Sequence, residues 1–107
     1  MTTVWVERDA QGVRGLSVSG HAGYAAKGHD IVCAAASVLI TTCVNALESV
    51  AGIRPLVEQS ADTACIRVSL PQSLALDREH DARIVLCTVL RGYEDIAAAY
   101  PDHLRIL

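Results

Sequence analysis

Alternating hydrophobic residues mark two pairs of strands in this chain. Residues 3–8 and 13–19 are short runs rich in β-branched residues, and the turn between them ends in Gly12. Residues 56–60 and 64–70 show the same alternation around a second short turn. The pattern therefore predicts two β-hairpins, each with one face turned toward a hydrophobic core.

The segment that follows each hairpin has the composition of an α-helix. Residues 31–50 are rich in alanine and contain no Gly or Pro, with Asp30 as the expected N-cap and Gly52 as the expected stop. A second helix is predicted from Asp77 to Tyr100, and a last strand from His103 to Leu107. In the second helix, apolar residues three and four positions apart form one stripe: Leu86, Val89, Leu90, Tyr93, Ile96 and Ala97.

The element order is therefore ββαββαβ. It predicts an α+β fold of two layers, in which both helices pack on one face of a mostly antiparallel sheet. The 107 residues fit a single domain covering residues 1–107. The chain contains no Phe and only 4% aromatic residues, so Ala, Val, Leu and Ile must fill the interior. Such small side chains allow close packing between the layers.

Charge and cysteine usage narrow the class of protein. The net charge of −3 and the scattered Lys and Arg residues argue against direct nucleic-acid binding, which favours a basic surface. The most apolar stretch, residues 31–44, is shorter than the roughly 18 residues of a membrane span. We therefore expect a buried helix there and no membrane association. Four cysteines without a secretory signal predict reduced thiols and a cytoplasmic protein.

The segment from Gly20 to Ser37 holds the candidate chemistry. His21 follows a strand, and Cys33 lies in the first turn of the predicted helix, at its third position if Asp30 is the cap. The unpaired N–H groups at a helix start favour a thiolate and can bind an oxyanion. The helix dipole contributes only about 0.3–1 kcal/mol, so an efficient nucleophile also needs a cationic partner. His21 is the candidate for that partner.

The residues alone also allow other interpretations. A cysteine near a helix start is commonly a small buried hydrophobic residue. His103 could approach Cys33 through the sheet in place of His21. Ser37, one turn beyond Cys33, could bond back to the Cys33 carbonyl or reach the thiol. A metal site would use His21, His29, Asp30 and Cys33, although their spacing matches no common zinc pattern. Packing is expected to account for Cys43, Cys65 and Cys87.

The segment Gly20-His-Ala-Gly-Tyr, followed by Gly28-His-Asp-Ile-Val-Cys-Ala-Ala-Ala-Ser37, resembles the signature of the ribosomal-processing cysteine proteases, the Prp family. The resemblance extends over essentially the whole chain. It implies a homodimeric enzyme of ββαββαβ type with a Cys–His dyad and no metal or organic cofactor. The nucleophile then falls on Cys33 and the base on His21, with Asp30 and Ser37 in supporting positions.

The same resemblance implies a substrate. The family removes an N-terminal extension from large-subunit ribosomal protein twenty-seven and cuts after an aromatic residue, which implies an apolar pocket. A substrate loop, mobile until substrate binds, would consist of Ala22, Gly23, Tyr24, Ala25, Ala26, Lys27, Gly28 and His29. Two other functions stay open at this stage. One is a non-catalytic dimeric module that docks on a ribosomal protein or assembly factor, and the other is a metal-binding regulator.

Overall fold

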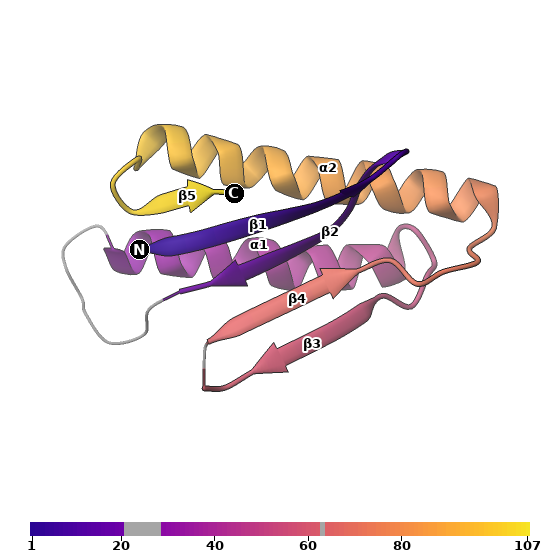
Figure 1. Ribbon diagram of the computed structural model, residues 1–107, viewed down its shortest axis with the longest axis horizontal. Helices are drawn as coiled ribbons and strands as arrows, with labels where there is room; N and C mark the ends of the chain where they lie inside the picture. The colour runs from indigo at the N-terminus through magenta and orange to yellow at the C-terminus, as the bar shows by residue number, and fades with distance from the viewer. Residues whose placement is uncertain (21–28, 63) are drawn as a thin grey trace.

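The described residues form two helices and five strands in the predicted order. The computed structural model describes residues 1–20, 29–62 and 64–107, and it describes His29 and Asp30 by their backbone only. The elements are β1 (Thr2–Asp9), β2 (Gly12–Ser19), α1 (His29–Ser49), β3 (Leu56–Ser60), β4 (Cys65–Ser69), α2 (Leu76–Ala99) and β5 (Leu104–Ile106). Both helices lie behind the same face of the sheet (Figure 1), so the predicted two-layer α+β fold is confirmed.

The sheet places the first and last strands side by side. Its strand order is β3-β4-β2-β1-β5, and every pair is antiparallel except β1 with β5. In that parallel pair Thr2 lies opposite Leu104. The predicted mostly antiparallel sheet is therefore confirmed. The last strand, β5, is an edge strand of this sheet and lies next to β1.

The core lies between the sheet and the two helices. The sheet contributes Val4, Leu16, Val18, Val68 and Leu104; α1 contributes Val32, Ala36, Ile40, Cys43 and Leu47; α2 contributes Ala82, Leu86, Val89, Leu90 and Tyr93. The predicted stripe on α2 is thus confirmed, with Ile96 and Ala97 half-buried at its end. All five residues of β3 are exposed, so this edge strand lies beyond the cover of the helices (Figure 1).

Small residues bring the two helices close together. Tyr93, the largest fully buried side chain, donates a hydrogen bond of 2.8 Å to the carbonyl of Ala36 on α1. Burial raises the pKa of Tyr93, so its hydroxyl stays protonated as a donor. Beside it, a Cβ on Gly92 would come within 3.0 Å of the Leu39 side chain. A glycine at this position therefore permits the approach of α1 to α2.

The ends of α1 agree only partly with the sequence. Gly52 has a φ of +69°, and the N–H of Ile53 reaches the Leu47 carbonyl at 3.0 Å, which is the predicted glycine stop. The prediction that Asp30 caps the helix is wrong, because α1 begins at His29. Cys33 is accordingly the fifth helical residue and not the third.

Helix α1 also has the length and composition of a membrane-spanning segment. Its residues Ile31–Ser49 have a mean hydropathy of 1.8. In this fold, however, one face of the helix packs against the sheet and α2, as a core helix does. The expectation that this stretch is too short to span a membrane is therefore wrong, and the expectation of a buried helix holds for one face only, because 28% of the segment is buried.

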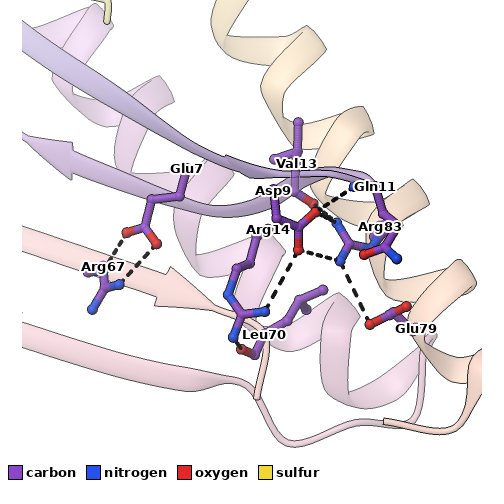
Figure 2. A network of polar contacts seen from close by, with 9 residues as sticks. All are labelled: Glu7, Asp9, Gln11, Val13, Arg14, Arg67, Leu70, Glu79 and Arg83. Carbon is purple, nitrogen blue, oxygen red and sulfur yellow. Dashed lines mark hydrogen bonds and ion pairs between the residues drawn. The ribbon is translucent and has the colours of Figure 1, made fainter. Parts of the chain in front are cut away.

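Ion pairs join the strands on the uncovered face and fasten the tip of the first hairpin (Figure 2). Arg67 on β4 contacts both carboxylate oxygens of Glu7 on β1, with Nη2 at 2.9 Å from Oε2. At the tip, Arg83 of α2 binds Asp9 at 2.8 Å. The Arg67 hydrogen bond lowers the pKa of Glu7, and the Arg83 hydrogen bond lowers the pKa of Asp9.

The Glu7–Arg67 pair predicts an acid-sensitive part of the folding stability. Because the folded pKa of Glu7 is lowered, the pair stabilises the fold above the unfolded pKa and loses this effect as pH falls through the folded value. Arg67→Met should cost under about 1 kcal/mol at pH 7, since both groups are partly exposed. The gap to wild type should close between about pH 5 and pH 3 in urea unfolding. The control is Arg54→Met, because Arg54 is exposed and forms no ion pair with another described residue. If Arg67→Met were destabilised relative to wild type by the same amount at pH 7 and at about pH 3, the Glu7–Arg67 pair would not be the source of the acid sensitivity.

Candidate active site

Cys33 lies where the start of α1 meets the ends of β1 and β2. Its side chain is half-buried, and its Sγ lies 3.8 Å from the hydroxyl oxygen of Thr2, the first residue of β1. Gly20, directly after β2, lies next to both of these side chains. A Cβ on Gly20 would lie 3.7 Å from Thr2 Oγ1 and 4.0 Å from Cys33 Sγ. A thiol, a hydroxyl and a strand end therefore converge at one point.

The rotation of α1 explains why this thiol is at the rim of the core. Val32 and Ala36 are both buried, at 0% and 2% exposure. Each helical residue advances by about 100°, so Cys33 lies beside that buried face and one turn before Ala36. The thiol is held by the core but is not enclosed in it.

Cys33 opens onto an apolar cavity of about 190 Å³. The cavity is lined by Thr2, Val18, Gly20, Cys33, Ala36, Ser37, Ile40, Ala64 and Ile66. Ala64 has a φ of +49°, a backbone conformation that costs about 1 kcal/mol or more in a residue other than glycine. Such strain is common beside functional sites. The apolar pocket that the resemblance implied therefore has a counterpart next to the thiol.

A second cavity, of about 150 Å³, continues along α1. It is lined by Ile40, Thr41, Val44, Asn45, Val57, Gln59 and Ile66, so it shares Ile40 and Ile66 with the first. Together the two cavities form a groove between α1 and strands β3 and β4, here called the α1–β4 groove. It begins at Cys33 and runs toward the exposed edge strand β3.

Several predicted site residues fall outside the described part of the chain. They are His21 and the substrate loop from Ala22 to Gly28, and also the side chains of His29 and Asp30. The predicted Cys33–His21 pair and the ordering of the loop thus stay predictions. Of the four predicted metal ligands, the structure describes only the side chain of Cys33. Within the described ranges, no three His, Cys, Asp or Glu side chains converge as metal ligands do.

Two alternatives from the sequence can be placed. The carbonyl of His103 accepts a hydrogen bond of 2.9 Å from the Thr2 N–H, so β5 brings this histidine to the strand end that carries Thr2. His103 therefore stays open as an alternative base. Ser37 is exposed and lines the cavity next to Cys33. In the described part of the chain its hydroxyl forms no hydrogen bond, to the Cys33 carbonyl or elsewhere.

The other cysteines differ in accessibility. Cys43 is fully buried, and burial raises its pKa to about 12, which makes its thiol inert near neutral pH. Cys65 is half-buried and Cys87 is exposed. The expectation that packing accounts for all three is therefore wrong for Cys87. This residue lies off the apolar stripe of α2, and Cys65 alternates with Ile66, which packs against the core.

Thr2 is the site residue that the sequence analysis missed. It is 1% exposed, although it has a polar side chain at a strand position with the period-two spacing of buried Val4. A polar residue at a core position of a strand was the available signal. Its partner, however, is 31 residues away, and no local pattern identifies it.

The comparisons with known proteins agree with this geometry. The chain matches the family described as cysteine protease Prp over residues 1–105. The ribosomal processing cysteine protease Prp of Bacillus subtilis is 29% identical over 96 residues, covering 90% of this chain and 86% of the relative. The Staphylococcus aureus relative of the same name is 29% identical over 108 residues, covering 99% of this chain and 97% of the relative.

Solved structures show the same fold. The essential ribosomal processing protease Prp from S. aureus in complex with a substrate peptide has a TM-score of 0.86 and 26% identity, covering 100% of this chain and 98% of that one. Its complex with a covalently linked product peptide has a TM-score of 0.82 and 27% identity, covering 99% of this chain and 97% of that one. Of the functions that the sequence left open, the family match supports an enzyme. The chain belongs to the cysteine protease Prp family.

Proposed function

We propose that this protease acts in the cytoplasm and removes the N-terminal extension of large-subunit ribosomal protein twenty-seven, with Cys33 as nucleophile and His21 as base. The observation that carries the proposal is the Cys33 thiol at one end of the α1–β4 groove, whose two cavities have volumes of about 190 and 150 Å³. The S. aureus relative, which has been solved with a substrate peptide and with a covalently linked product peptide, supports it.

The proposed reaction is acyl transfer in two halves. His21 takes the proton of Cys33, and the thiolate attacks the scissile carbonyl to give a tetrahedral oxyanion. When the peptide C–N bond breaks, the leaving amine takes the proton from His21 and the acyl group stays on Cys33 as a thioester. Water then hydrolyses the thioester, with His21 accepting its proton, and the thiol is restored.

The start of α1 is suited to stabilise the oxyanion. In an α-helix the first four N–H groups have no partner within the helix, and here they belong to residues 29–32. These groups point out of the helix start and carry the positive end of the helix dipole, and the side chain of Cys33 leans back toward that end. Removing one oxyanion donor from a hydrolase costs about 10²–10³-fold in kcat, so this contribution exceeds that of the dipole alone.

The groove accounts for recognition of an apolar peptide. The first cavity would hold the aromatic residue before the cut, because Val18, Ile40 and Ile66 line it. The second cavity would hold a further side chain of the same peptide, over Val44 and Val57. Recognition thus depends on buried apolar area, which contributes about 25 cal/mol per Å².

Substitution of the two proposed catalytic residues should abolish cleavage without unfolding the protein. Cys33→Ala and His21→Ala should each lower the cleavage rate by at least about 10³-fold, because each removes a step of the covalent mechanism. The assay is mass spectrometry of a peptide that carries the N-terminus of the host's ribosomal protein. His103→Ala is the comparison variant and should retain most of the activity. Cleavage that survives His21→Ala but is lost in His103→Ala would show that His103 is the base.

Alkylation should distinguish an activated Cys33 from the other thiols. Near neutral pH, iodoacetamide should modify Cys33 well before Cys43, whose pKa is raised to about 12, and before half-buried Cys65. Exposed Cys87 would compete, so the experiment uses a Cys87→Ser background. Peptide mapping at short times gives the order of reaction. Cys33 as the slowest thiol, or uniform labelling, would contradict the proposal.

We also infer a homodimer, as the resemblance to the Prp family implies. Helix α1 carries no charged residue between Asp30 and Glu48, and the exposed side of this segment includes Ile31 at 59% and Val38 at 63%. An uncharged surface of this kind can pair with the same surface of a second copy around a two-fold axis.

Light scattering at tens of micromolar tests the dimer. Wild type should have twice the mass of one chain, and Val38→Lys should be a monomer because a buried unpaired charge is costly. Ile84→Lys, at an apolar position of α2 with 53% exposure, is the matched control and should leave the dimer intact. A monomeric wild type, or a dimer that tolerates Val38→Lys, would exclude this interface.

A further inference from the structure

Thr2 is a polar residue in a place that would suit an apolar one. Its side chain is 1% exposed, and it lies at the start of β1 on the face that contacts α1. The hydroxyl reaches one hydrogen-bond partner among the residues that the structure describes, the Sγ of Cys33 at 3.8 Å. Thiols are weak donors and weak acceptors, so this contact compensates little for the loss of water.

A valine would serve the fold about as well. Valine has nearly the same shape as threonine and fills the same space, and the hydrogen bond that it removes is a weak one to a thiol. Neighbouring Thr3 differs, because its Oγ1 accepts a hydrogen bond of 3.2 Å from Arg105 Nε. Stability therefore accounts for the polar group of Thr3 but not for that of Thr2.

The hydroxyl gains a strong partner when Cys33 is ionised. A thiolate has no proton to give, so the Thr2 O–H must be the donor, and hydrogen bonds to charged groups are roughly twice as strong as those between neutral groups. The donor is also held in place. The Thr2 N–H is bonded to the His103 carbonyl at 2.9 Å, and a β-branched side chain has few rotamers.

We propose that Thr2 is a positioning residue of this protease, whose hydroxyl donates a hydrogen bond to the Cys33 thiolate and holds Sγ toward the groove. This inference rests on the proposed role of Cys33 as nucleophile. The hydroxyl is weakly bonded in the resting thiol and strongly bonded in the reactive thiolate. It therefore shifts the balance of the two toward the reactive form.

The test measures reactivity and stability on the same variants. In the Cys87→Ser background, Thr2→Val should alkylate Cys33 about tenfold more slowly with iodoacetamide near pH 7, and its kcat for peptide cleavage should fall by a similar factor with little change in KM. Its urea unfolding midpoint should be equal to or above that of wild type. Thr2→Ser, which keeps the hydroxyl, should restore the alkylation rate. Thr3→Val is the matched control and should alkylate at the wild-type rate.

Each other result decides against the proposal or against its premise. Wild-type alkylation in Thr2→Val would overturn the hydrogen bond to the thiolate, even if cleavage fell, because alkylation forms no oxyanion. A slow Thr2→Val that Thr2→Ser does not rescue, or one that is markedly less stable, would reduce Thr2 to a packing role. Cys33→Ala is run in parallel. If it retains peptide cleavage, the nucleophile assignment itself fails, whereas its inactivity leaves that assignment standing whatever Thr2 does.

Discussion

The burial of one face of α1 fixes the position of the Cys33 thiol, and the other features of the candidate site depend on it. Val32, Ala36 and Leu47 must face the sheet and α2 because they are almost fully buried. With that face fixed, Cys33 has a single orientation, at the rim of the core and against the start of β1. A helix turned by one residue, about 100°, would place the thiol either in the core or in solvent.

The second helix supports this arrangement from behind. Gly92 allows α1 and α2 to approach closely, and the Tyr93 hydroxyl bonds to the Ala36 carbonyl one turn beyond Cys33. The ion pairs of Asp9 and Arg83 lie at the other end of β1, where they fasten the hairpin to α2 (Figure 2). The candidate site beside Thr2 and the ion pair of Asp9 with Arg83 therefore lie at opposite ends of β1.

The sequence predicts features that depend on residues close together in the chain, and it misses contacts between residues that are far apart in the chain. The stripe of α2 around Leu86 and Tyr93 and the glycine stop at Gly52 follow from spacing within a few residues, and both are confirmed. Cys33 belongs to a local motif, so the sequence could single it out as a candidate, and its role as nucleophile stays a prediction. Thr2 could not, since its contact with Cys33 depends on β1 lying between β2 and β5 and on the rotation of α1. The start of α1 at His29 was missed because Asp30 is a strong capping residue, and this preference placed the expected start two residues too late.

The central claim is that the core presents Cys33 to a peptide in the α1–β4 groove as the nucleophile. The most direct measurement is an acid quench of the enzyme with its substrate peptide during the first turnover, followed by intact mass and peptide mapping. We predict an adduct with the mass of the N-terminal product, attached by a thioester to Cys33. An adduct on Cys65 or Cys87, or turnover with no covalent intermediate on any cysteine, would contradict this account.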